Sequence, residues 1–205
     1  MTRSWQQRGG NFALYFYATV IPMNGHTLIE KATALALRAH DGQMRKEAPV
    51  PYLVHPVEVA LILARHGWSD TVVAAALVHD TVEDTPVTLE DVRNELGREV
   101  AELVAPVTHD DSLSWDDKKK AYIESVRAAS PEVKAISVAD KIANAESLIA
   151  AAGEQGAAVW QHFNRGRDKK LWFEHAMLAM LRESWQDPLV DEYAKLVEKL
   201  DMLAH

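Results

Sequence analysis

The sequence predicts an all-α fold, a single irregular bundle of helices. From Met23 onward apolar residues recur at helical spacing, and capping residues precede most of these stretches. No stretch shows the alternation of polar and apolar residues that is typical of a half-exposed strand. The 205 residues, 48% hydrophobic and 25% charged, suffice for one large domain with a buried core. A small hairpin within a loop would still be compatible with this prediction.

Each predicted helix begins at a capping residue or a proline, and most end near a glycine or a proline. The starts are Thr27 with Glu30, His55-Pro56, Ser69, Thr88 with Asp91, Ser114, and Ser130-Pro131. The predicted helix ends include Gly67, Gly97 and Gly153, and a loop is expected between residues 41 and 54. Two further helices, over residues 167–185 and 189–203, are separated by Asp187-Pro188.

Charge and composition exclude several classes of protein. With 22 basic and 30 acidic residues the net charge is −8, so the overall field repels nucleic acids and anionic membranes. The absence of cysteine excludes disulfides and thiolate metal sites. No stretch approaches the ~20 apolar residues that cross a bilayer. We therefore expect a cytoplasmic protein that binds neither nucleic acid nor membrane.

The first 22 residues allow two interpretations. Arg3 and Arg8 precede an apolar run over residues 12–21, an arrangement similar to a weak signal peptide. The run is ended by Pro22 without a small-residue cleavage site, which favours the second interpretation. In that interpretation residues 1–22 are an extension upstream of the natural start at Met23, and the domain covers residues 23–205.

A cluster of ionisable residues follows the most apolar stretch of the chain. His79-Asp80 comes directly after the apolar residues 72–78, where an unpaired carboxylate is costly. Glu83 and Asp84 lie four residues further on, one helical turn away. Three carboxylates this close repel one another unless a cation is present. The cluster therefore indicates a metal site, and a solvated acidic helix end is the alternative.

Further ligands must come from other parts of the chain. His55 stands at the start of a predicted helix, and Asp140 lies on the apolar stripe of a long helix. Asn144 and Ser147 follow on the same stripe, so a hydrogen-bonded structural aspartate is the alternative interpretation. Two histidines and two aspartates nevertheless form a mixed nitrogen and oxygen set that suits manganese, iron or zinc.

The order His55, His79-Asp80, Asp140 resembles the metal-binding signature of the HD-domain phosphohydrolases. Four segments resemble the hydrolase domain of the RelA/SpoT homologues, which act on the alarmones ppGpp and pppGpp. These segments are AHDGQMRK (39–46), PYLVHP (51–56), AALVHDTVEDT (75–85) and SVADKIAN (137–144). The resemblance covers about residues 26–150, and the C-terminal helices more loosely. It implies a single HD-domain helical bundle of the stand-alone small alarmone hydrolase type.

The resemblance also implies a role for each matching residue. The implied ligands of the metal, usually Mn²⁺, are His55, His79, Asp80 and Asp140. Glu83 and Asp84 match the pair that positions or activates water. The implied substrate-binding residues are Arg45 and Lys46 at the base, and Lys141, Asn144 and Ser147 at sugar and phosphate. His40 belongs to a matching segment and is expected to be structural or to support a ligand.

The function implied is Mn-dependent hydrolysis of the 3′-diphosphate of guanosine alarmones, releasing pyrophosphate with GDP or GTP. Another nucleotide is an alternative substrate, such as ppApp, the 2′-phosphate of NADPH or a nucleoside monophosphate. The segment 47–50 lacks the glycine often found after the Arg-Lys pair, which leaves the choice of purine open. A non-catalytic alarmone-binding module is the remaining alternative, and the acidic pair Glu83-Asp84 argues against it.

Two basic stretches have a more ordinary interpretation. Residues 118–120 are three consecutive lysines, which we interpret as a solvated helix face. Residues 165–170 carry four basic side chains that would either steer phosphates or form the solvated start of a helix, and the latter is the commoner case.

Overall fold

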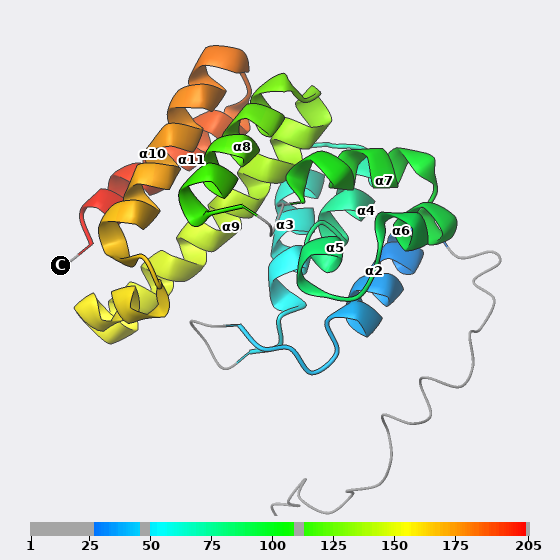
Figure 1. Cartoon of the computed structure of the whole chain (residues 1–205), viewed down its shortest axis with the longest axis horizontal. Helices are drawn as coiled ribbons and strands as arrows, with labels where there is room; N and C mark the ends of the chain where they lie inside the picture. The colour runs from blue at the N-terminus through cyan, green and yellow to red at the C-terminus, as the bar shows by residue number, and fades with distance from the viewer. Residues whose placement is uncertain (1–26, 46–49, 109–112, 204–205) are drawn as a thin grey trace, which may run out of the picture.

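The computed structural model describes residues 27–45, 50–108 and 113–203, and the predictions for residues 1–22 and for Lys46 lie outside these ranges (Figure 1). The all-α prediction is confirmed. The α-helices are α2 (Leu28–Ala39), α3 (Val54–Arg65), α4 (Asp70–Leu77), α5 (Thr81–Asp84), α6 (Leu89–Leu96), α7 (Arg98–Val104), α8 (Trp115–Ala128), α9 (Pro131–Gln155), α10 (Gly166–Ser184) and α11 (Pro188–Asp201). Short 3₁₀ segments, η1 (Ala105–Val107) and η2 (Gly156–His162), follow α7 and α9. Among the described residues, β-structure is limited to an isolated bridge between Met44 and Pro51.

Capping residues set the helix starts as predicted. Thr27 and Glu30 form a complete capping box at α2, and Thr88 and Asp91 form another at α6. Further helix starts are capped by hydroxyls that accept a backbone N–H, namely those of Ser69 at α4, Ser114 at α8 and Ser130 at α9. Each cap satisfies a backbone donor that the first helical turn leaves free, typically contributing about 1 kcal/mol.

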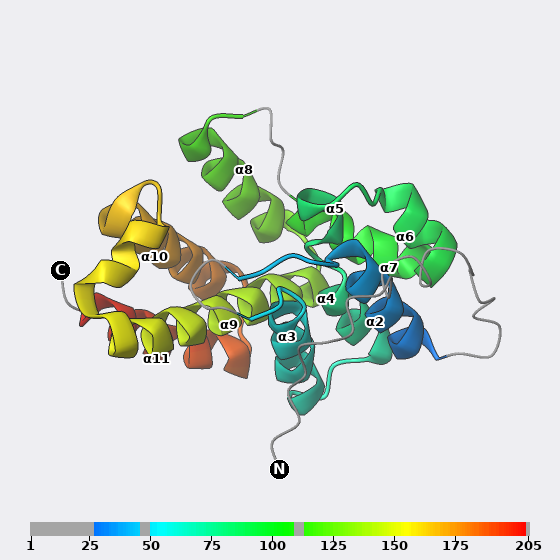
Figure 2. The same cartoon turned by 90° about the horizontal axis from the view of Figure 1, so that it is seen from below.

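Helix α9 is the centre of the core. Every residue from Val133 to Ala143 is buried, so this helix is covered on all sides over about three turns. Helices α3 and α4 pack on one part of α9, and α11 packs on another. Figures 1 and 2 show α9 linking the α2–α7 group of helices to the group formed by α8, α10 and α11. A polar side chain in this stretch therefore needs a partner within the protein.

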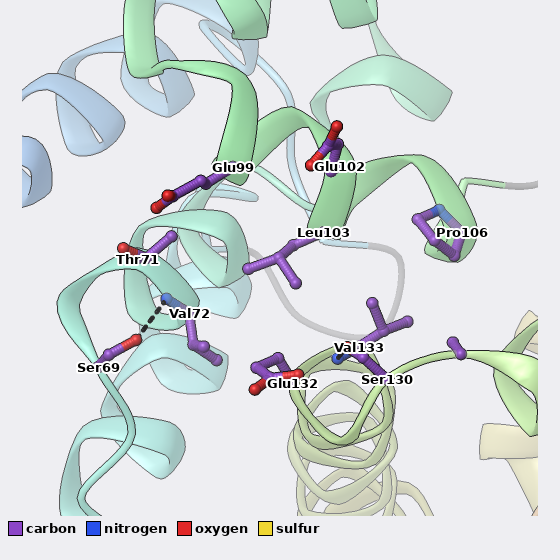
Figure 3. Close-up of a pocket in the computed structure, with 11 residues that line it drawn as sticks. Ser69, Thr71, Val72, Glu99, Glu102, Leu103, Pro106, Ser130, Glu132 and Val133 are labelled. Atoms are coloured by element: carbon purple, nitrogen blue, oxygen red, sulfur yellow. Dashed lines mark hydrogen bonds between the residues drawn. The ribbon is translucent and has the colours of Figure 1, made fainter.

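Helices α4 and α9 begin at a common surface groove of about 520 Å³ (Figure 3). Ser69 and Val72 at the start of α4 line it together with Ser130 and Val133 at the start of α9. His79 lies seven residues beyond Val72, just past α4, and Asp140 lies seven residues beyond Val133 on α9. At 1.5 Å per residue both are carried about 10 Å from the groove.

Helix α7 was not predicted, and two helix boundaries differ from the prediction. Helix α9 continues through Gly153 and ends at Gly156, whose φ of 58° is a left-handed conformation that favours glycine. Gly153 stays helical because a glycine within a helix costs only about 1 kcal/mol. The apolar stretch of α4 ends at Leu77, and the separate short helix α5 begins at Thr81. No described helix combines the length and hydrophobicity that a membrane span requires.

Candidate metal centre

Three parts of the fold bring the four predicted metal ligands together. His55 lies in the first turn of α3, His79 and Asp80 lie between α4 and α5, and Asp140 lies in α9. His55, His79 and Asp140 are buried, with 1%, 4% and 8% of their surface exposed. Burial of two imidazoles and a carboxylate at one point requires that they bind each other or a cation.

The spacing of the ligand atoms suits a single metal ion. His55 Nε2 lies 3.0 Å from Asp140 Oδ1 and 3.5 Å from Asp80 Oδ2. His79 Nε2 lies 3.1 Å from Asp80 Oδ1 and 3.8 Å from Asp140 Oδ1. Nitrogen and oxygen ligands about 2.1 Å from one cation lie roughly 3–4 Å from each other. His55, His79 and Asp80 form a group that could hold one metal ion, and Asp140 adjoins it through the two histidines.

The end of α4 fixes the ring of His79. Its Nδ1 donates to the carbonyl oxygen of Ala76 at 2.7 Å, which leaves Nε2 facing the carboxylates. Thr81 Oγ1 donates to the carbonyl of Val78 at 2.7 Å, so side chains satisfy two carbonyls where α4 ends. His79 Nε2 is buried and faces two carboxylate oxygens, Asp80 Oδ1 at 3.1 Å and Asp140 Oδ1 at 3.8 Å. A histidine whose second nitrogen donates to a backbone carbonyl is typical of metal ligands.

Attraction between opposite charges outweighs burial in this cluster. Burial raises the pKa of Asp80, but His79 lowers it below its usual range. Burial likewise raises the pKa of Asp140, whereas Lys141 and His55 bring it well below the usual value. Burial lowers the pKa of His79, while the two carboxylates raise it well above its usual value. The opposite charges of neighbouring side chains thus outweigh the effect of burial for all three groups.

Lys141 and Asn144, both predicted to bind substrate, contact the ligand Asp140. Lys141 Nζ donates to Asp140 Oδ2 at 2.7 Å, and Asn144 Nδ2 donates to Oδ1 at 2.5 Å. Arg45 Nη2 donates to Asn144 Oδ1 at 3.4 Å, which places the predicted base contact next to the metal cluster. Ser147 lies half-buried on α9, three residues beyond Asn144.

The predicted water-activating pair lies on α5, directly after the ligands. The N–H of Asp84 donates to the carbonyl of Asp80 at 2.9 Å, so these residues are one helical turn apart as expected. Glu83 is half-buried and Asp84 is exposed. Although the side chain of Asp84 is exposed, loss of hydration at its carboxylate and the charges of Asp80 and Glu83 raise its pKa, which makes it a better proton acceptor than an isolated aspartate.

Tyr52 is a site residue that the sequence analysis did not single out. Its hydroxyl donates to Asp80 Oδ2 at 2.5 Å. Burial and the charge of Asp80 raise the pKa of Tyr52 far above its usual value, so the hydroxyl keeps its proton. The signal available in the sequence was a tyrosine three residues before His55, at one turn's spacing.

The lysine run 118–120 is not uniformly solvated, which corrects the prediction for Lys119. Lys119 is half-buried on α8, and its Nζ lies 4.7 Å from the centre of the Phe173 ring. Burial and the neighbouring Lys141 lower the pKa of Lys119 to about 8. Buried Tyr122 and Val126 follow at positions i+3 and i+7, a pattern that places Lys119 on the inner face of α8. Lys120 is exposed, as predicted.

The basic stretch 165–170 has partners within the protein. Lys169 Nζ lies 2.5 Å from Asp116 Oδ1, and Lys170 Nζ lies 2.5 Å from Glu174 Oε1. Arg167 donates to the carbonyl of Asp201 at 2.9 Å. These contacts favour the structural interpretation of this stretch over phosphate steering.

The groove in Figure 3 is separate from the metal cluster and has a different character. Glu99, Glu102 and Glu132 line it, and none of the four predicted ligands does. Anionic nucleotides are repelled by such a lining.

Comparisons with known proteins relate the chain to nucleotide hydrolases. The HD domain family matches residues 32–168. The chain is 41% identical over 109 residues to the bifunctional (p)ppGpp synthase/hydrolase SpoT of Escherichia coli, a match that covers 53% of this chain and 15% of SpoT. It is also 41% identical over 121 residues to the human guanosine-3′,5′-bis(diphosphate) 3′-pyrophosphohydrolase MESH1, covering 58% of this chain and 68% of MESH1.

Two solved structures share the fold. The Listeria monocytogenes protein lmo0812 matches with a TM-score of 0.67 at 40% identity, covering 75% of this chain and 99% of that chain. A metazoan SpoT orthologue, described as hydrolysing ppGpp, matches with a TM-score of 0.73 at 28% identity, covering 86% and 97%. The chain belongs to the HD domain family, within the group of proteins that includes MESH1 and SpoT.

Proposed function

We propose that the chain is a metal-dependent pyrophosphohydrolase that removes the 3′-diphosphate of a guanosine alarmone such as ppGpp. The observation that carries the proposal is the cluster of His55, His79, Asp80 and Asp140, followed directly by the acidic pair on α5. The names of MESH1 and SpoT support the choice of substrate. A cytoplasmic location is part of the proposal.

The four ligands would hold a divalent metal, and a set that mixes imidazole and carboxylate suits manganese, iron or zinc. Among these we propose Mn²⁺, on the resemblance to the alarmone hydrolases. When bound, such a metal lowers the pKa of a water and polarises a phosphoryl oxygen. Asp84 is the residue that accepts a proton from the attacking water, since its raised pKa suits a general base. Glu83 orients that water. Water attacks the phosphorus linked to O3′, the bond to O3′ breaks, and pyrophosphate leaves with GDP as the second product.

Cations beside the cluster offset the charge of the substrate in an otherwise acidic protein. Arg45 presents a planar guanidinium that stacks on a purine, and Lys46 and Ser147 complete the proposed nucleotide site. Asn144 links Arg45 to the ligand Asp140. We add Lys119 to this set, because its half-buried ammonium lies 4.7 Å from the centre of the Phe173 ring, which Lys141 Nζ also approaches at 5.2 Å. Its position favours a contact with phosphate over a purely solvated role.

A substrate panel tests the proposal. The metal-free protein is loaded with Mn²⁺ and incubated with ppGpp, ppApp, NADPH and deoxynucleoside monophosphates, and the products are separated by ion-exchange chromatography. We expect GDP and pyrophosphate in equal amounts from ppGpp, and no turnover after exhaustive chelation. Orthophosphate from NADPH or from a monophosphate, with ppGpp left intact, would show a different nucleotide phosphohydrolase. Tight binding of ppGpp without any product would show a binding module.

A further inference from the structure

The segment between α2 and α3 is joined to the metal centre at two points. Tyr52 Oη donates to Asp80 Oδ2 at 2.5 Å, which attaches the segment to a predicted ligand. Gln43 Nε2 donates to the main-chain carbonyl of Asp84 at 3.1 Å, which attaches it to α5. The same segment carries Arg45, whose N–H donates to the carbonyl of Val50 at 3.0 Å. One short piece of chain thus contacts the ligand, the acidic pair and the predicted nucleotide site.

Three residues hold this segment together, and we name them the tether: His40, Gln43 and Tyr52. His40, 4% exposed at the end of α2, approaches Gln43 Oε1 with Nδ1 at 2.8 Å. Because the amide nitrogen of Gln43 donates to Asp84, its oxygen accepts, so Nδ1 of His40 carries the hydrogen. The ring of His40 lies 4.7 Å from that of Tyr52, and the N–H of Tyr52 donates to the carbonyl of Gln43 at 2.9 Å.

The tether constrains the carboxylate of Asp80 on the side away from His79. Asp80 Oδ1 lies 3.1 Å from His79 Nε2, while Oδ2 accepts from Tyr52 and lies 3.5 Å from His55 Nε2. A carboxylate held at both oxygens cannot rotate freely about its Cβ–Cγ bond. Tyr52 thus supplies a restraint on Asp80 from the segment between α2 and α3.

We propose that Tyr52 is a positioning residue that presents Asp80 to the metal, and that His40 and Gln43 hold Tyr52 in place. The inference rests on the metal-binding role proposed above. Groups that orient metal ligands typically change metal affinity by about 10–100-fold when they are removed. Tyr52 therefore acts on the metal through Asp80.

Metal binding measured without substrate tests this inference. Metal-free protein is titrated with Mn²⁺, and the free ion is followed by its electron paramagnetic resonance signal. We expect Tyr52→Phe to weaken Mn²⁺ binding by about 10–100-fold, because the ring remains and only the hydrogen bond is lost. Tyr193→Phe is the matched control, since it removes a buried hydroxyl that donates to Glu174, a carboxylate that is not a predicted ligand. Its Mn²⁺ affinity stays at the wild-type value.

A second variant guards against a folding defect in Tyr52→Phe. Gln43→Leu removes both side-chain bonds of the half-buried Gln43, and circular dichroism verifies that each variant is folded. We expect Gln43→Leu to weaken Mn²⁺ binding less than Tyr52→Phe does. Wild-type affinity in the folded variants would overturn the inference, whatever substrate the enzyme uses. Failure of the wild-type protein to bind Mn²⁺, Co²⁺ or Zn²⁺ would instead overturn the proposed function.

Discussion

Two buried carboxylates, Asp140 on α9 and Glu174 on α10, have different surroundings. Glu174 is 1% exposed, lies 2.5 Å from Lys170 Nζ, and accepts the hydroxyl of Tyr193. Burial raises its pKa, but Lys170 and Lys141 lower it below the usual value. Its charge and both its oxygens are thus satisfied by the protein itself.

The network around Asp140 is open by comparison. Asp140 has Lys141 and Asn144 as partners, but it also adjoins two histidines, with His55 Nε2 at 3.0 Å and His79 Nε2 at 3.8 Å. His55 Nδ1 is buried without a hydrogen bond among the described residues. Asp80 adds a second carboxylate where Glu174 has none. A closed network stabilises a fold, whereas an open one has capacity left for a ligand. The difference indicates which of the two buried charges serves function.

The largest contrast is expected between Asp140→Asn and Glu174→Gln, which remove the same charge from each network. Asp140→Asn loses a ligand, so we expect Mn²⁺ binding to be lost and ppGpp hydrolysis to fall by at least ~10³-fold, equivalent to several kcal/mol. Glu174→Gln leaves metal content and kcat within about threefold of wild type, provided the protein is folded. Metal analysis after dialysis and steady-state kinetics measure both. Equal losses of metal and of activity in the two variants would show that the two networks do not differ in function.

Substitution of the acidic pair tests whether these residues on α5 are needed for catalysis at the metal centre. Asp84→Asn and Glu83→Gln keep size and hydrogen bonding but remove basicity, and we expect kcat to fall by ~10²–10⁴-fold with Mn²⁺ affinity retained. Single-turnover kinetics on metal-loaded protein give the rate of the chemical step. Loss of metal in Glu83→Gln would make that residue a ligand, and an unchanged kcat in both variants would remove the acidic pair from the mechanism.

A smaller effect on activity is expected from the basic side chains that are proposed to bind the substrate. Lys119→Met and Arg45→Ala remove contacts present in both ground and transition states, so we expect KM to rise about tenfold with kcat nearly unchanged. Lys120→Met is the matched control, because it removes one lysine from the exposed side of the same helix. An equal rise in KM in the control would show that the Lys119 variant loses only one positive charge and no specific contact with substrate.

The closed network contributes mainly to pH-dependent stability. The pKa of Glu174 is lowered on folding from an ordinary value of 4.5, so its stabilising contribution is present above about pH 4.5. That contribution is lost as pH falls through the lower, folded-state pKa. We expect Glu174→Gln to reduce the free energy of unfolding by about 3 kcal/mol at pH 7 and by less in acid. Urea unfolding between pH 7 and pH 3 checks this, and a constant difference would contradict it.

The sequence predicted those features that depend on local chemistry. Helix starts followed from hydroxyl caps such as Ser69 and Ser130, and the structure confirms them. The four metal ligands are brought together as predicted, although their roles remain predictions. Family membership, indicated by the HDTVEDT segment, is confirmed by the match to the HD domain.

Features that depend on distant contacts were not predicted. The bond from Tyr52 to Asp80 joins residues 28 positions apart, and nothing local marks the tyrosine as a partner. The position of Lys119 over Phe173 depends on how α8 meets α10, so the lysine run alone favoured a solvated face. The break between α4 and α5 arises because the His79 and Thr81 side chains bind the carbonyls that would continue the helix.

The common starting point of α4 and α9 at the acidic groove has a consequence for insertions and deletions. His79 and Asp140 each lie seven residues beyond a valine that lines this groove. One residue inserted between Val133 and Asp140 would turn the carboxylate by about 100° around the axis of α9 and shift it by about 1.5 Å. The same insertion in the loop before Ser130 leaves that helical register intact. Chain length is therefore restricted within these two short stretches, whereas the connecting loops are free to vary.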